Sequence, residues 1–60
     1  MNNDIAKGKV KQVKGRVKED IGRVNGDKST EIEGKMEHIA GIIQEEYGKV
    51  TQNVQKALRE

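Results

Sequence analysis

Apolar side chains recur along the chain with a helical period. In each half they stand three or four residues apart, and at about 100° per residue such positions fall on one narrow stripe of a helix. The first stripe contains Val10, Val13, Val17, Ile21 and Val24, and the second contains Met36, Ile39, Ile43, Tyr47 and Val50. The pattern therefore predicts two amphipathic helices, because a strand would alternate apolar and polar residues instead.

The two stripes belong to an internal repeat. A shift of 26 residues lays segment 8–24 over segment 34–50, and the Gly, Lys, Gly, Glu, Gly and Val residues of the two copies coincide. Repeated segments of this kind are typical of one structural unit used twice. We therefore expect two related helices over about residues 4–24 and 31–47, arranged as a hairpin.

Local signals mark where these helices begin and end. Asn25-Gly26-Asp27 is typical of a turn, and Thr30 with Glu33 three residues later matches a capping box for the second helix. Gly48 is placed to close that helix. Thr51 could then cap a short third helix that continues to Leu58.

Six glycines recur every seven residues within the two predicted helices, and they lie nearly opposite the apolar stripes. They are Gly8, Gly15, Gly22, Gly34, Gly41 and Gly48. A glycine inside a helix costs about 1 kcal/mol relative to alanine, so six of them need a reason. Either the helices break or fray at these points, or a second close contact is made across the glycine face.

The fold class that follows is all-α: a small helical bundle built from two repeated helical units and a short C-terminal helix. Residues 1–60 form a single domain, because a chain of 60 residues cannot divide its core. We predict that the two stripes pack on each other, since each alone is too narrow to be stable in water. The predicted core is Val10, Val13, Val17, Ile21, Met36, Ile39, Ile43 and Tyr47.

The ordered motifs of the two copies resemble the CsbD-like family of small bacterial general stress-response proteins. The resemblance rests on GKVKQVKGRVKEDIG, from Gly8 to Gly22, and on IEGKMEHIAGIIQEEYG, from Ile32 to Gly48. It covers the chain from about Asp4 to Leu58. It implies a compact helical bundle, a cytoplasmic location and a role in general stress, without an accepted biochemical activity.

Residues that could support catalysis or bind a metal or cofactor are scarce. The single histidine, His38, lies opposite the second apolar stripe and is predicted to be a solvated surface residue, and no metal-ligand spacing surrounds it. The hydroxyl residues lack a nearby base, and the Gly-Lys pairs lack the spacing of a phosphate-binding loop. We expect no catalytic residue, no cofactor, no metal and no small-molecule substrate, and therefore no enzyme.

Composition suggests where the protein acts. The absence of cysteine fits a reducing compartment, and neither a signal-peptide core nor a run of about 20 apolar residues is present. We therefore expect a cytoplasmic protein. With 37% charged residues and one aromatic residue, a hydrophilin-like protectant that is partly disordered stays open as an alternative.

Charge is divided unequally between the two halves. Residues 1–28 carry a net charge of +4 and residues 29–60 a net charge of −2. Four lysines, Lys7, Lys11, Lys14 and Lys18, line one flank of the first stripe. They are the candidate site for weak contact with an anionic membrane or a nucleic acid, the alternative being a solvated face attracted to the acidic second half of the chain. The sequence does not identify another partner, and for the oligomeric state it is compatible with a monomer or a weak homodimer.

Overall fold

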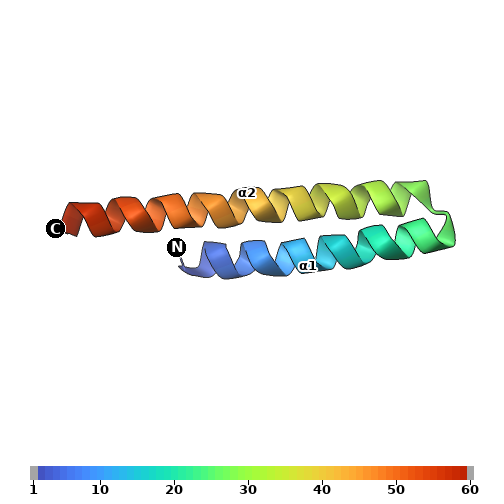
Figure 1. Cartoon of the computed structure of the whole chain (residues 1–60), viewed down its shortest axis with the longest axis horizontal. Coiled ribbons are helices and arrows are strands. Elements are labelled where there is room, and N and C mark those ends of the chain that lie inside the picture. The colour runs from blue at the N-terminus through green and yellow to red at the C-terminus, as the bar shows by residue number, and fades with distance from the viewer. Residues whose placement is uncertain (1, 60) are drawn as a thin grey trace.

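The computed structural model describes the backbone of residues 2–59 and the side chains of residues 3–59, and it shows two long helices. Helix α1 spans Asn2–Asn25 and helix α2 spans Lys28–Arg59, and they lie side by side in opposite directions (Figure 1). The hairpin is thin, with extents of 52, 12 and 9 Å, and α2 continues past the first turn of α1. The prediction of an all-helical fold is confirmed for the described residues, which contain no strand.

The turn between the helices forms where the sequence predicts it. Gly26 has a φ of 71°, the left-handed conformation that glycine adopts without steric cost. Its amide donates to the Arg23 carbonyl at 3.2 Å, and the Asp27 amide donates to the Gly22 carbonyl at 2.7 Å. These two bonds satisfy carbonyls at the end of α1 in a Schellman motif, so the chain reverses within two residues.

The start of α2 differs from the prediction, because Asp27 rather than Thr30 is its cap. The Thr30 amide donates to Asp27 Oδ1 at 3.2 Å, and the Thr30 hydroxyl donates to Asp27 Oδ2 at 2.8 Å. These bonds to Thr30 hold the pKa of Asp27 below its ordinary value. The helix therefore starts at Lys28, and Thr30 lies within its first turn.

The predicted third helix is wrong. Helix α2 runs without interruption through Gly48 and Thr51 to Arg59. The Thr51 hydroxyl donates to the Tyr47 carbonyl at 2.9 Å, a bond made inside a helix rather than at its cap. Gly48 lies inside the helix and faces Ile5 of α1, where a side chain at this position would be crowded.

The two helices meet through their glycines, which are buried. An ideal Cβ built on Gly8 would lie 2.6 Å from the Gly41 carbonyl oxygen, and one built on Gly41 would lie 2.5 Å from the Gly8 carbonyl oxygen. Gly15 and Gly34 form a second reciprocal pair. An ideal Cβ built on either of them would lie 2.5 Å from the carbonyl oxygen of the other. Of the two explanations for the glycines, the close contact is therefore the one observed, and the helices do not break at these positions.

This arrangement contradicts the predicted core. No hydrophobic side chain among residues 3–59 is buried, and the eight predicted core residues are each at least 49% exposed. The eight are Val10, Val13, Val17, Ile21, Met36, Ile39, Ile43 and Tyr47. The physical reason is angular: glycines and stripe lie on opposite sides of each helix, so only one of the two can face the other helix. Here the glycines do, and both stripes face outward.

Polar side chains complete the contact between the helices along one edge. Glu45 is 7% exposed, and its Oε2 lies 2.8 Å from the Lys9 Nζ and 3.1 Å from the Lys49 Nζ. Gln12 donates to the other carboxylate oxygen. The bond to Lys9, followed by those to Gln12 and Lys49, lowers the pKa of Glu45 to about 2.

A second cluster on the same edge lies near the turn. Arg23 pairs with Glu31 of α2 at 3.4 Å and with Glu19 of its own helix at 3.2 Å. Lys35 of α2 approaches Glu19 at 3.9 Å. The two clusters therefore tie α1 to α2 near the middle of the hairpin and near its closed end.

A first prediction concerns the glycine contact. Gly15→Ala and Gly41→Ala should each lower the free energy of unfolding by about 1 to 3 kcal/mol, because the added methyl group overlaps backbone atoms of the facing helix. Urea unfolding followed by circular dichroism measures this change. Gln52→Ala, at an exposed position of α2, is the control and should have little effect. An increase in stability for either glycine variant would show that the helices are not in close contact there.

A second prediction concerns acid. Because the pKa of Glu45 is about 2 in the hairpin against an ordinary value of 4.5, its contribution is complete above pH 4.5 and is lost as pH falls from about 4.5 to about 2. Glu45→Gln should therefore reduce the fall in urea midpoint across that interval. Glu46→Gln, whose carboxylate is exposed, should retain the fall. Equal pH profiles for the parent and Glu45→Gln would contradict the assignment.

Candidate functional site

The four lysines selected from the sequence form a continuous row on α1. Lys7, Lys11, Lys14 and Lys18 are all exposed. At about 100° per residue they lie roughly 40° to 100° from the direction of the glycines, all on the same side. We call these four residues the lysine row. They follow the edge of the hairpin where α1 borders α2.

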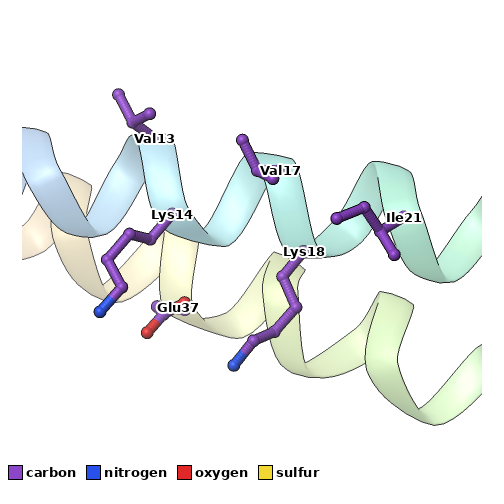
Figure 2. A pocket seen from close by; sticks show the side chains of 6 residues that line it. All are labelled: Val13, Lys14, Val17, Lys18, Ile21 and Glu37. Carbon is purple, nitrogen blue, oxygen red and sulfur yellow. The ribbon is translucent and has the colours of Figure 1, made fainter.

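Two side chains of the lysine row lean toward α2, and none of the four pairs with it. Figure 2 shows Lys14 and Lys18 extending over the neighbouring helix, on either side of Glu37. Neither forms an ion pair with Glu37 or with any other residue of the segment 3–59, and the same holds for Lys7 and Lys11. Glu37 Oε1 is buried and receives no hydrogen bond from the described side chains. All four ammonium groups are therefore available to an external anion.

The cations that do form ion pairs lie on the other edge of the hairpin. They are Lys9, Arg23, Lys28, Lys35 and Lys49, and their partners include Glu19, Glu31 and Glu45. Around the axis of α1, the residues of this edge lie roughly 40° to 120° from the direction of the glycines. The lysine row lies on the opposite side of that direction. The hairpin thus has one edge whose cations form ion pairs and one edge where, among the described side chains, the four lysines form none.

An exposed apolar surface borders the lysine row. Val13, Val17 and Ile21 line an open groove of about 380 Å³ together with Lys14, Lys18 and Glu37 (Figure 2). We call Val10, Val13, Val17, Ile21 and Val24 the α1 stripe; its members are 52% to 84% exposed. Cationic side chains therefore rise directly beside a band of aliphatic side chains on one helix.

The second copy of the repeat has no equivalent of the lysine row. The repeat shift of 26 residues places Glu33, Glu37, Ala40 and Gln44 at the corresponding positions of α2. Gln44 instead donates to Asp4 of α1 at 3.2 Å. The basic surface therefore belongs to α1 alone, although both helices carry an exposed stripe.

The sequence places the lysine row beside the α1 stripe, as the structure does, but predicts that this stripe is buried in the core. The structure exposes it. The signal that could have identified the surface was the seven-residue glycine spacing, which marks the side of each helix that admits a close neighbour. His38 also differs from its prediction, because it is half-buried beside Gly15 on the glycine side of α2.

The described residues hold neither a cluster of metal ligands nor a membrane-spanning helix. Residues 2–59 contain no group of three or more histidine, cysteine, aspartate or glutamate side chains placed to hold a metal ion. Neither of the two helices, as far as the structure describes them, combines the length and apolar character that a membrane span requires.

Comparison with known proteins places the chain in a family. The CsbD-like family model matches residues 4–56. UPF0337 proteins of Bordetella pertussis, Bordetella parapertussis and Bordetella bronchiseptica are each 47% identical over 60 residues, which is 100% of this chain and 91% of each relative. No solved structure matches the chain. On the family model and these relatives, the chain belongs to the CsbD-like family of general stress-response proteins.

Proposed function

We propose that this protein is a non-catalytic accessory of the stress response that binds the anionic surface of the bacterial membrane from the cytoplasm, through α1. One observation carries the proposal: four lysines without ion pairs stand beside an apolar stripe that is at least 52% exposed. A helix that lies in a membrane interface combines these two features, with cations at the headgroups and aliphatic side chains at the acyl boundary.

The α1 stripe favours a membrane over a nucleic acid. Phosphates of a nucleic acid would be neutralised by the lysine row alone, and the neighbouring valines would gain nothing from that contact. At a lipid surface, the same valines leave water while the lysine stems extend past them to the headgroups. The juxtaposition of both kinds of side chain therefore supports lipid as the ligand.

The strength of such binding follows from the charges. Each lysine near an anionic leaflet contributes about 1 kcal/mol, so the four together contribute roughly 4 kcal/mol at most. The contribution decreases within a Debye length, which is about 8 Å at physiological ionic strength. The binding should therefore be reversible and sensitive to salt. Burial of the α1 stripe should add a smaller contribution to the binding free energy, which salt does not weaken.

A second candidate is a hydrophilin-like protectant that is partly disordered in dilute solution and helical on a surface or on drying. The observation that favours it is the absence of any buried hydrophobic side chain among residues 3–59, which removes the usual driving force of folding. A thermal melt followed by circular dichroism separates the candidates: the hairpin melts cooperatively in dilute solution, whereas a protectant of this kind shows little helix at any temperature.

The test of membrane binding uses vesicles of phosphatidylcholine with and without phosphatidylglycerol, at low and near-physiological salt. We expect binding only to the anionic vesicles, and weaker binding as salt rises. Lys14→Gln with Lys18→Gln should weaken binding by roughly 30-fold, from two lysines at about 1 kcal/mol each. The matched control, Lys28→Gln with Lys56→Gln, removes the same charge outside the lysine row and should weaken it far less.

Other results would contradict the proposal. Absence of binding to anionic vesicles at low salt would exclude it. Equal losses for the two double variants would show that net charge, and not the lysine row, determines binding. Val13→Ser with Val17→Ser tests the stripe, since this change should reduce vesicle binding and leave any binding to duplex DNA unaltered. Stronger binding to duplex DNA than to vesicles would favour a nucleic-acid ligand instead.

A further inference from the structure

Helix α2 carries its own exposed apolar surface, which the proposed membrane contact leaves unused. We call Ile32, Met36, Ile39, Ile43, Tyr47 and Val50 the α2 stripe; its members are 49% to 65% exposed. These residues lie on the side of α2 opposite Gly34 and Gly41, which face α1. Within residues 3–59 nothing covers this stripe.

The α2 stripe is nearly symmetric about the level of Gly41 along the helix. Ile39 and Ile43 stand two residues on either side of that level, and Ile32 and Val50 stand nine residues on either side. Met36 and Tyr47 are close to a third matched pair, at five and six residues. A stripe with this symmetry can pack on an antiparallel copy of itself so that an apolar residue always meets another.

Charges beside the stripe follow the same symmetry with opposite sign. Lys35 stands six residues before Gly41 and Glu46 five residues after it, and both lie on the same flank of the stripe. In an antiparallel pair related by a two-fold axis, each flank meets the identical flank of the other copy. Lys35 would therefore meet Glu46 of the second copy, and the interface would contain this pair twice.

Both side chains are free enough to make that contact. The side chain of Lys35 is 60% exposed and that of Glu46 is 64% exposed. Their present contacts are long, at 3.9 Å from Lys35 to Glu19 and 3.5 Å from Glu46 to Lys49. Exposed ion pairs of this kind contribute little, so exchanging them for contacts in a dimer costs little.

The accessible surface of the single hairpin matches the size of a missing interface. The hairpin exposes 4616 Å², whereas a compact monomer of 6.7 kDa exposes about 3,900 Å². The excess is roughly 700 Å², and a standard protein interface buries about 800 Å² per partner. One helix-to-helix contact along the α2 stripe is therefore of the size needed to bring the chain to ordinary compactness.

We infer that a second copy of this chain occupies the α2 stripe, antiparallel to the first and with the two-fold axis at the level of Gly41. The inference does not depend on membrane binding, because it uses the other helix. The axis is perpendicular to the plane that contains the helices, so it leaves both lysine rows on the same side of the dimer. The contact spans about 27 Å of helix, which is short, and the dimer should dissociate on dilution.

Analytical ultracentrifugation from about micromolar to millimolar protein tests the inference, and the expected result is a monomer–dimer equilibrium. Ile43→Asp should weaken dimerisation at least about 100-fold, because it places an unpaired carboxylate in the interface. Val17→Asp, at the equivalent position of α1, is the matched control and should leave dimerisation unchanged. Circular dichroism confirms that both variants stay helical, as expected for side chains that lie outside the hairpin contact.

A charge exchange tests the antiparallel register. Lys35→Glu and Glu46→Lys should each weaken dimerisation alone, because like charges then face each other. An equimolar mixture of the two variants should dimerise as the parent does, since every flanking pair in the mixed dimer is again attractive. A parallel dimer would give a different result, because each position would then lie level with its own counterpart. The parent and both single variants would all have like charges facing each other, so neither variant alone would weaken dimerisation, and the mixture would dimerise more tightly than the parent.

Three results would overturn the inference. The first is a monomer at every concentration. The second is failure of the mixed variants to recover dimerisation. The third is an Ile43→Asp variant that keeps the parent's mass distribution but loses binding to phosphatidylglycerol vesicles, which would identify lipid as the occupant of the α2 stripe. Loss of vesicle binding in the lysine-row variants, by contrast, leaves the dimer unaffected, so the two proposals fail separately.

Discussion

The close approach of the two helix backbones at their glycines is the constraint on which the rest of this structure depends. The contact consists of two glycine pairs, Gly8 with Gly41 and Gly15 with Gly34. In each pair, a Cβ atom added to one glycine would collide with the carbonyl oxygen of the other. In this geometry the Cα hydrogens can act as weak donors, each contributing about 0.5 to 1 kcal/mol. Any side chain at these positions would hold the helices apart, and the contact along the whole hairpin would change.

The glycine contact also determines where everything else lies. Because the glycines take the inner side of each helix, the apolar stripes are outside and the charged side chains occupy the two edges. On one edge, Glu19 and Glu45 join cations from both helices. On the other edge, the lysine row has no acidic residue within ion-pair distance among the described side chains. The two edges of the hairpin therefore differ in whether their cations form ion pairs.

The same arrangement gives the two helices of this CsbD-like chain different exposed surfaces. The exposed surface of α1 is cationic and apolar, whereas that of α2 is apolar with Lys35 and Glu46 on one flank. The two proposals use these surfaces separately, with lipid on α1 and a second copy of the chain on α2.

The sequence by itself determined the helices, the turn and the lysine row, because these depend on local interactions. Helical periodicity, the conformational freedom of Gly26 and the spacing of Lys7 to Lys18 act within a few residues of chain. The cap at Asp27 was mispredicted because Asp27 and Thr30 are both residues that cap helices. The continuity of α2 past Gly48 was mispredicted because this glycine faces Ile5 of α1, a contact that the local sequence does not reveal. Only the tertiary structure decided which side of each helix faces inward. The helices could pack through their apolar stripes, burying Val17 and Ile43, or through their glycines, with close contact at Gly15 and Gly41. Both arrangements are physically reasonable. They exclude each other because they lie on opposite sides of the same helices, and helical period alone does not choose between them.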